Sequence, residues 1–156
     1  MILRAGRPED CSQMADLLNE IIALGGTTAH QHPMTAEEVR RYFLDGPGAE
    51  SALLAWDGAR LIGWQSLGLW QGEMHIGTFV RLGVQAKGVG AALFAATVVA
   101  ARAKGLKEII AHIRADNAPG LSFYARMGFT DTGADPDFAL DDGTVVGRVF
   151  RRFDIV

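Results

Sequence analysis

The chain has 156 residues, of which 49% are hydrophobic and 21% charged, and its formal net charge is −3. This length and composition are typical of one folded domain rather than a disordered chain. The acidic balance argues against a nucleic-acid-binding protein, because binding to a phosphate backbone relies on a basic surface. The single cysteine, Cys11, excludes an internal disulfide framework and a cysteine-rich metal site.

The N-terminus and the apolar segments bear on localisation. Met1–Ala5 lacks the long apolar core of a signal peptide. The apolar run 91–101 is shorter than a bilayer span, and Arg102 and Lys104 follow it at once. We therefore expect a cytoplasmic protein with no membrane partner.

Hydrophobic periodicity and turn residues predict a mixed α/β domain with the element order βααβββαβαββ. Thr35 and Glu38 form a capping box, Asp57-Gly58 is a hairpin signal, and Asn117 is a good N-cap. The expected strands span 2–5, 51–56, 60–67, 73–82, 107–113, 129–132 and 145–154. The expected helices span 9–23, 36–44 and 117–128, and a loop with its helix occupies 85–104.

The loop Gln85-Ala86-Lys87-Gly88-Val89-Gly90 follows a predicted strand and opens a predicted helix. Such a loop presents backbone N–H groups at the positive end of the helix dipole, where phosphates bind. The Walker lysine and hydroxyl are missing, which excludes a P-loop NTPase. A dinucleotide site would need glycine in place of Leu93 and an acid at the end of the next strand, which ends instead in Ala111-His112-Ile113. Taken alone, the loop indicates either a coenzyme A site or two glycines that only allow close helix packing.

A second motif follows the next predicted strand and contains Asn117, Tyr124 seven residues later, and Gly128-Phe129. Together with Gln85-x-x-Gly88-x-Gly90, it resembles the signature of the GCN5-related N-acetyltransferase (GNAT) superfamily. The resemblance covers 73–129 directly, and the element order extends it to a single domain over 1–156. It implies a mostly antiparallel central sheet flanked by helices. It also implies acetyl transfer from acetyl-CoA, the cosubstrate, to an amine.

A narrower likeness to the phosphinothricin acetyltransferase branch lies in four short segments. These are Asn19-Glu20-Ile21-Ile22, Thr27-Thr28, Pro33-Met34-Thr35 and Thr78-Phe79-Val80. Members of that branch acetylate small amino-acid-like molecules, so the likeness favours a small-molecule amine, such as an amino acid or its analogue. Two alternatives stay open: acetylation of a protein N-terminus or lysine, and a non-catalytic acyl-CoA-binding module.

The GNAT resemblance implies a set of cofactor contacts. Backbone amides from Lys87 to Ala91 would hold the CoA pyrophosphate, and the backbone at Val80 and Leu82 would pair with the pantetheine arm. The Val80 N–H would also support the thioester oxyanion. Lys87 either assists the phosphates or is a solvated loop residue. The cofactor-binding residues expected are Val80, Leu82, Gln85, Lys87, Gly88, Val89, Gly90, Ala91 and Asn117.

Three residues are candidates for proton transfer. Tyr124 matches the family's acid, which protonates the CoA thiolate, although a tyrosine here also suits the face of an amphipathic helix. His75 stands where phosphinothricin-type enzymes carry a glutamate, and a histidine titrates near neutral pH. Glu73 lies on the same strand face and is either the base or a group that orients His75. A histidine without a role and a solvated acid remain the plainer interpretations.

Contacts with the acceptor are expected from the 24–34 loop and the hairpin strands. The candidates are Thr27, Thr28, His30 and Trp64, with His32 and Trp70 as further ones, although Trp64 also suits a core. The pair His30-x-His32 has no nearby cysteine or acid, so no metal site is expected.

Two further expectations concern the mechanism and the assembly. Cys11 lies far in sequence from the motifs, so we expect direct attack in a ternary complex rather than an acetylated enzyme. A homodimer is also considered, with Trp70 as an exposed contact.

Overall fold

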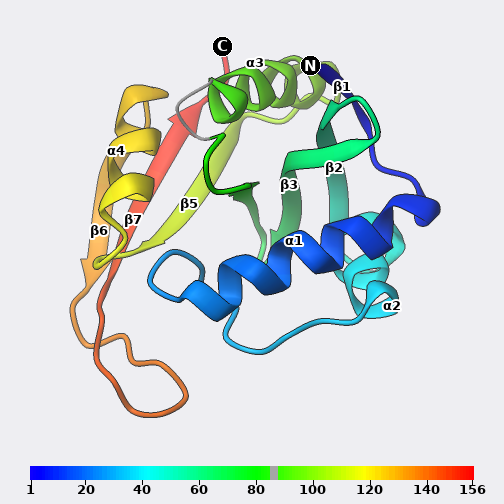
Figure 1. Ribbon diagram of the computed structural model, residues 1–156. Coiled ribbons are helices and arrows are strands. Elements are labelled where there is room, and N and C mark those ends of the chain that lie inside the picture. Colours follow the sequence, from blue (N-terminus) through cyan, green and yellow to red (C-terminus); the bar gives the residue numbers. More distant parts are fainter. Residues whose placement is uncertain (85–87) are drawn as a thin grey trace.

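The structure is a computed structural model that describes residues 1–84 and 88–156 (Figure 1). One sheet of seven strands has the order β1-β2-β3-β4-β5-β7-β6. Every neighbouring pair is antiparallel except β4 and β5, which are parallel. The strands are β1 (Ile2–Ala5), β2 (Ala49–Asp57), β3 (Arg60–Trp70), β4 (Glu73–Val80), β5 (Glu108–Arg114), β6 (Thr130–Asp135) and β7 (Arg148–Asp154).

The helices divide between the two faces of this sheet. The helical elements are η1 (Pro8–Asp10), α1 (Cys11–Leu24), α2 (Ala36–Val39), η2 (Arg40–Asp45), α3 (Val89–Ala103) and α4 (Ala118–Arg126). Buried residues of α1, α2 and η2 pack on one face, and buried residues of α3 and α4 pack on the other. The order βααβββαβαββ and the mostly antiparallel sheet are therefore confirmed.

Trp64 lies at the centre of the core beneath α1 and η2. Its side chain is completely buried, and its ring packs against Phe43 and Phe79 at centroid distances of 5.7 and 4.7 Å. The expectation that Trp64 contacts the acceptor is therefore wrong. Its indole lines neither of the two cavities described below, because the pleat of β3 directs it into the core.

The second predicted helix changes its winding halfway. Thr35 caps it as expected, since its Oγ1 accepts from the Glu38 N–H at 3.1 Å and its own N–H donates to Glu38 Oε1 at 3.1 Å. From Arg40 the chain forms the wider turns of a π-helix. Gly46 then closes against the helix, where a Cβ would overlap the carbonyl oxygen of Arg41. Such π segments are frequent at functional sites.

Strand pairing is sparsest in the middle of the sheet, between β4 and β5. Among the described residues, only His75 and Ile110 pair between β4 and β5, whereas β3 and β4 pair from Gly63–Val80 to Trp70–Glu73. Beyond this pair the two strands diverge and leave an opening between them. The N-terminus of α3 and the helix α4 border that opening.

Two other findings complete the fold. The last strand begins at Arg148 rather than at residue 145, because 136–147 form a loop closed by an isolated bridge between Ala139 and Val145. Among the described residues, no helix is both long enough and apolar enough to cross a bilayer.

Candidate active site

A cavity of about 800 Å³ fills the opening between β4 and β5. Its walls come from 77–80 of β4, 112–114 of β5, the first turn of α3 and one side of α4. We call this cavity the β4–β5 groove. Its size suits a small-molecule or cofactor ligand.

Gly88 and Gly90, at the start of α3, are each suited to glycine for a different structural reason. Gly88 has φ 75°, the left-handed conformation that glycine adopts most easily, and it turns the chain into the helix. A Cβ at Gly90 would come within 2.8 Å of the Phe123 ring, so this glycine lets α3 approach α4. Gly88, Gly90 and Ala91 line the groove, while the Val89 side chain is buried. The predicted contacts Gln85 and Lys87 lie outside the described residues.

Asn117 joins the groove wall to a loop that is distant in sequence. Its Oδ1 accepts from the Gly120 N–H at 3.0 Å, which confirms the predicted N-cap of α4. Its Nδ2 donates to the carbonyl oxygen of Thr27 at 2.8 Å. Val80 and Leu82, the other predicted cofactor contacts, also line the groove.

Tyr124 lies inside the groove and is buried. Its hydroxyl is 2.8 Å from Thr78 Oγ1, which accepts from Gln65 Nε2 at 3.0 Å. Burial raises the pKa of Tyr124 to about 12, so the phenol keeps its proton at neutral pH. With the Gln65 amide donating to it, the Thr78 hydroxyl can donate to the Tyr124 oxygen and leave the phenolic proton available. The motif predicted Tyr124 as the acid, whereas its contact with Thr78 and the Thr78–Gln65 bond were not predicted.

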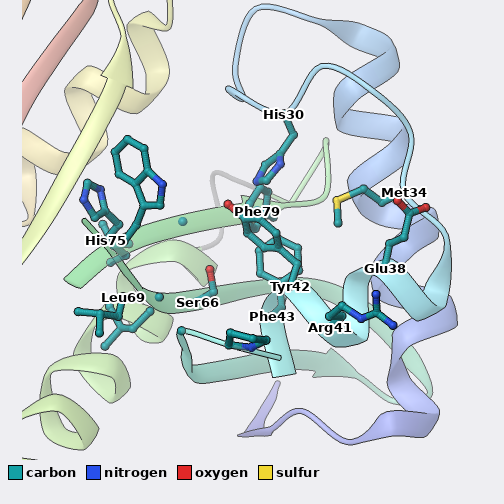
Figure 2. Close-up of a pocket in the computed structure, with 17 residues that line it drawn as sticks. His30, Met34, Glu38, Arg41, Tyr42, Phe43, Ser66, Leu69, His75 and Phe79 are labelled. Carbon is teal, nitrogen blue, oxygen red and sulfur yellow. The ribbon is translucent and has the colours of Figure 1, made fainter. Parts of the chain in front are cut away.

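A second cavity of about 510 Å³ lies on the face of the sheet covered by α1 and η2 (Figure 2). We call it the aromatic pocket. Figure 2 shows His75 at one end, Glu38 and Arg41 at the other, and aromatic rings between them. Its lining includes His30, Met34, Glu38, Arg41, Tyr42, Phe43, Ser66, Gly68, Trp70, His75, Gly77 and Phe79.

The two cavities meet. His30, Ile76, Gly77 and Phe79 line both of them. Gly77 has no side chain to separate the two spaces. A ligand in the groove and another in the aromatic pocket would therefore approach each other across β4.

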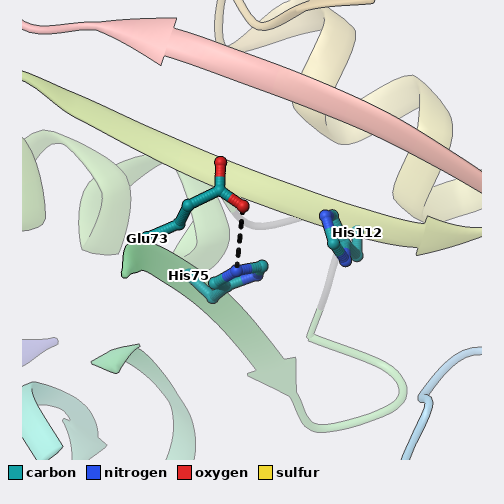
Figure 3. A group of neighbouring side chains, drawn as sticks. All are labelled: Glu73, His75 and His112. Carbon is teal, nitrogen blue, oxygen red and sulfur yellow. Dashed lines mark ion pairs between the residues drawn. The ribbon is translucent and has the colours of Figure 1, made fainter. Parts of the chain in front are cut away.

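His75 lies beside Glu73 and His112 (Figure 3). Its Nε2 is 4.0 Å from Glu73 Oε1, and its ring centroid is 4.6 Å from that of His112. Burial lowers the pKa of His75, against the opposing effect of the Glu73 carboxylate. Burial likewise lowers the pKa of His112, to about 4. Glu73 is half exposed and lines neither cavity.

Residues 14–129 match the family model described as the acetyltransferase (GNAT) family. The chain belongs to this family. The matched range includes every predicted catalytic and binding residue, and the family expected from the two sequence motifs is confirmed.

Relatives of this GNAT chain differ in how much of their length they share with it. A mycothiol acetyltransferase of Actinosynnema mirum is 35% identical over 119 residues, which are 70% of this chain and 38% of that protein. The chain spans about two fifths of the length of the mycothiol acetyltransferases that it matches. An L-methionine sulfoximine/L-methionine sulfone acetyltransferase of Pseudomonas paraeruginosa is 28% identical over 144 residues, which are 85% of this chain and 83% of that protein.

A solved structure supports the fold assignment. The phosphinothricin acetyltransferase of Sinorhizobium meliloti, in complex with AcCoA, has a TM-score of 0.84 at 16% identity. The match covers 99% of this chain and 88% of that one. The looser resemblance to the phosphinothricin acetyltransferase branch is thus also found among the structural neighbours of this GNAT chain.

Within the GNAT fold, the 24–34 loop, which was predicted to contact the acceptor, lines the groove more than the aromatic pocket. Thr27 and Thr28 line the groove and are absent from the lining of the aromatic pocket. The Thr28 carbonyl oxygen accepts from Arg114 Nη1 at 3.2 Å, and Arg114 also pairs with Asp116 at 2.7 Å. Contact of these threonines with a ligand in the aromatic pocket is therefore not supported. The hydrogen bond from Arg114 to the Thr28 carbonyl was not predicted, because residues 28 and 114 come together only in the fold.

The two histidines of the same loop point to different partners. His30 stands at the junction of the two cavities, its ring 5.1 Å from Tyr42, and burial lowers its pKa. His32 is exposed, and its Nε2 lies 2.7 Å from Asp141 of the 136–147 loop. They therefore do not form a joint ligand pair.

Cys11 is 3% exposed in the core, and burial raises the pKa of its thiol. A buried thiol of raised pKa is a poor nucleophile, which agrees with the expectation that no acetyl-cysteine forms.

Proposed function

We propose that this protein transfers an acetyl group from acetyl-CoA to the amine of a small molecule, by direct attack in a ternary complex. The observation that carries the proposal is the junction of the β4–β5 groove with the aromatic pocket at His30, Ile76, Gly77 and Phe79. A thioester in the groove and an amine in the pocket would meet there. Membership of the GNAT family supports acetyl-CoA as the donor.

The groove provides suitable surroundings for the donor. The first turn of α3 presents backbone N–H groups that no preceding helical turn satisfies, and these suit the pyrophosphate. Arg126 lines the same groove and adds positive charge. The backbone of Val80 and Leu82 would run beside the pantetheine arm, and the Val80 N–H remains our candidate for the oxyanion.

Two side chains would move the protons. The amine attacks the thioester carbon and loses a proton to His75, which lines the aromatic pocket. When the tetrahedral intermediate collapses, the C–S bond breaks and Tyr124 gives its proton to the CoA thiolate. Glu73 lines neither cavity and lies 4.0 Å from His75, so we assign it the role of orienting His75.

An amino acid or amino-acid analogue is the acceptor class that the aromatic pocket fits best. Its rings and Met34 suit an apolar or thioether-like side chain. Arg41 lies at the end opposite His75, beside Glu38, with which it interacts electrostatically. A carboxylate at Arg41 would direct the amine toward His75. The relatives named for methionine sulfoximine and phosphinothricin agree with this class.

The test is an acetyl-transfer assay with free thiol as the readout. Amino acids, their sulfoximine and phosphinic analogues, simple amines and short peptides are screened with acetyl-CoA. We expect turnover with the amino-acid-like compounds, and Arg41→Gln should raise their KM more than it lowers kcat. Turnover with peptides alone would replace the small-molecule proposal by protein acetylation. Binding of acetyl-CoA without any turnover would favour the acyl-CoA-binding module.

The same assay separates the two candidate bases. His75→Gln should lower kcat by about 100-fold or more, the usual contribution of a general base. Glu73→Gln should lower it by less, since Glu73 acts through His75. The reverse order of effects would make Glu73 the base. Chelator is present throughout, so that trace metal does not affect the comparison.

A further inference from the structure

Glu73, His75 and His112 each direct a ligand atom toward one small region beside the β4–β5 pair (Figure 3). These atoms all lie within 4.8 Å of one another. The topology explains the grouping, because His75 pairs with Ile110 and His112 follows two residues later on the same face of β5. We call these residues the 73/75/112 cluster.

The donor atoms of the cluster have few competing partners. His75 Nε2 is buried and has no hydrogen bond among the described residues. Aromatic neighbours hold both imidazole rings in place, with Trp70 at 5.3 Å from His75 and Phe150 at 4.4 Å from His112. A buried imidazole nitrogen without a partner carries an energetic cost that a ligand would remove.

We propose that the 73/75/112 cluster binds a divalent transition-metal ion of the Zn²⁺ type, and that the bound ion inhibits acetyl transfer by occupying His75. Two imidazoles and one carboxylate are a common zinc ligand set that leaves a fourth position for water. Metal binding stands on the geometry alone, while the inhibition rests on the proposed function of His75.

The cluster needs little movement to close around an ion. Ligand atoms of tetrahedral zinc lie about 3.3 Å apart, so each atom must shift by no more than about 1 Å from the present arrangement. Glu73 is 49% exposed, so its long side chain can readily make its own part of this movement.

The surroundings provide an entry path and set a limit on affinity. His75 lines the aromatic pocket and His112 lines the groove, so an ion can reach the cluster from either cavity. Arg148 packs over Phe138 and Phe150 and adds positive charge near both histidines. We therefore expect micromolar affinity for Zn²⁺, with Cu²⁺ tighter and Co²⁺ weaker.

The binding test uses the untagged protein and two probes, Zn²⁺ by calorimetry and Co²⁺ by its visible absorption. We expect one ion per chain and an absorption band typical of tetrahedral cobalt. His112→Phe keeps an aromatic ring between Trp70 and Phe150 but removes a ligand, so the Zn²⁺ Kd should rise more than tenfold. His32→Asn removes an exposed histidine outside the cluster and should leave the Kd unchanged.

The outcomes separate the metal site from the proposed function. Equal Zn²⁺ affinity in the parent protein, His112→Phe and Glu73→Gln, all with cooperative melting, would overturn the site. If the site is correct, Zn²⁺ should lower acetyl transfer by the parent at least tenfold, and chelator should restore it. Each variant is compared with its own metal-free rate, and His112→Phe should need more Zn²⁺ for the same loss. Binding without inhibition would overturn the inhibitory role alone, and binding without any amine turnover would overturn the proposed function and leave the site standing.

Discussion

Tyr124 reaches the groove as the last member of a chain of three hydrogen-bonded side chains. Gln65 on β3 donates to Thr78 on β4, and Thr78 shares a hydrogen bond with Tyr124 on α4. The first bond leaves the Thr78 proton free, because a hydroxyl that accepts from Gln65 can still donate to Tyr124. In that arrangement Tyr124 accepts from Thr78, and its own proton is available to a thiolate in the groove.

Thr78→Val tests this chain at the scale of one residue. Valine keeps the shape of threonine but leaves the Gln65 amide and the Tyr124 phenol without their partner. We expect kcat to fall about tenfold, which corresponds to the loss of about one hydrogen bond at the transition state. The KM for acetyl-CoA should change little. Thr78→Ser keeps the hydroxyl and should stay near the parent, and an equal loss in both variants would assign Thr78 a packing role instead.

At the scale of elements, the 24–34 loop is fastened to the far side of the groove by its own backbone. The carbonyl oxygens of Thr27 and Thr28 accept from Asn117, the N-cap of α4, and from Arg114, the last residue of β5. Asn117 also caps α4 through its other side-chain atom. The Asn117 side chain therefore both caps α4 and holds the 24–34 loop, which lines both cavities.

Two substitutions at Asn117 separate its two contacts. Asn117→Ala removes the cap and the loop contact, and it should lower the free energy of unfolding by about 1 to 2 kcal/mol. Asn117→Asp keeps an oxygen for the cap but loses the donor to the Thr27 carbonyl. We expect amide exchange in 25–32 to accelerate in both variants, whereas α4 should lose protection only with alanine. Slow exchange of the loop in the aspartate variant would show that Arg114 alone holds it.

The features that the sequence predicted correctly are local. The Thr35–Glu38 box and the Asn117 cap depend on residues three apart, so their chemistry is visible in one segment. Contacts set by strand pairing were predicted poorly. Trp64 was placed in the site because the sequence does not say which face of a half-buried hairpin meets the core, and β3 directs it toward Phe79. His112 was missed because it joins His75 only through the parallel pairing of β4 with β5.

At the scale of the whole molecule, the sheet consists of two parts that share little strand pairing. β1 to β4 form one continuous antiparallel part, and β5, β7 and β6 form the other. Among the described residues, the pair His75–Ile110 is the single strand pairing between them, and the groove lies between 77–80 and 112–114. A ligand that contacts 77–80 on one wall and 112–114 on the other therefore adds the contacts that strand pairing omits.

We accordingly expect acetyl-CoA to stabilise both parts together. A free ligand concentration one hundred times Kd contributes about 2.7 kcal/mol if only the folded state binds. For a chain of this size, that gain corresponds to an increase in Tm of roughly 5 to 10 °C. Amide exchange should slow on both walls, at 77–80 and at 112–114, and not only at the start of α3. Pantetheine without phosphates should protect the walls less, because it lacks the groups that we propose the helix N-terminus to bind. Protection confined to α3 would agree with pyrophosphate binding at the helix N-terminus. It would contradict contact of the pantetheine arm with the two walls of the groove.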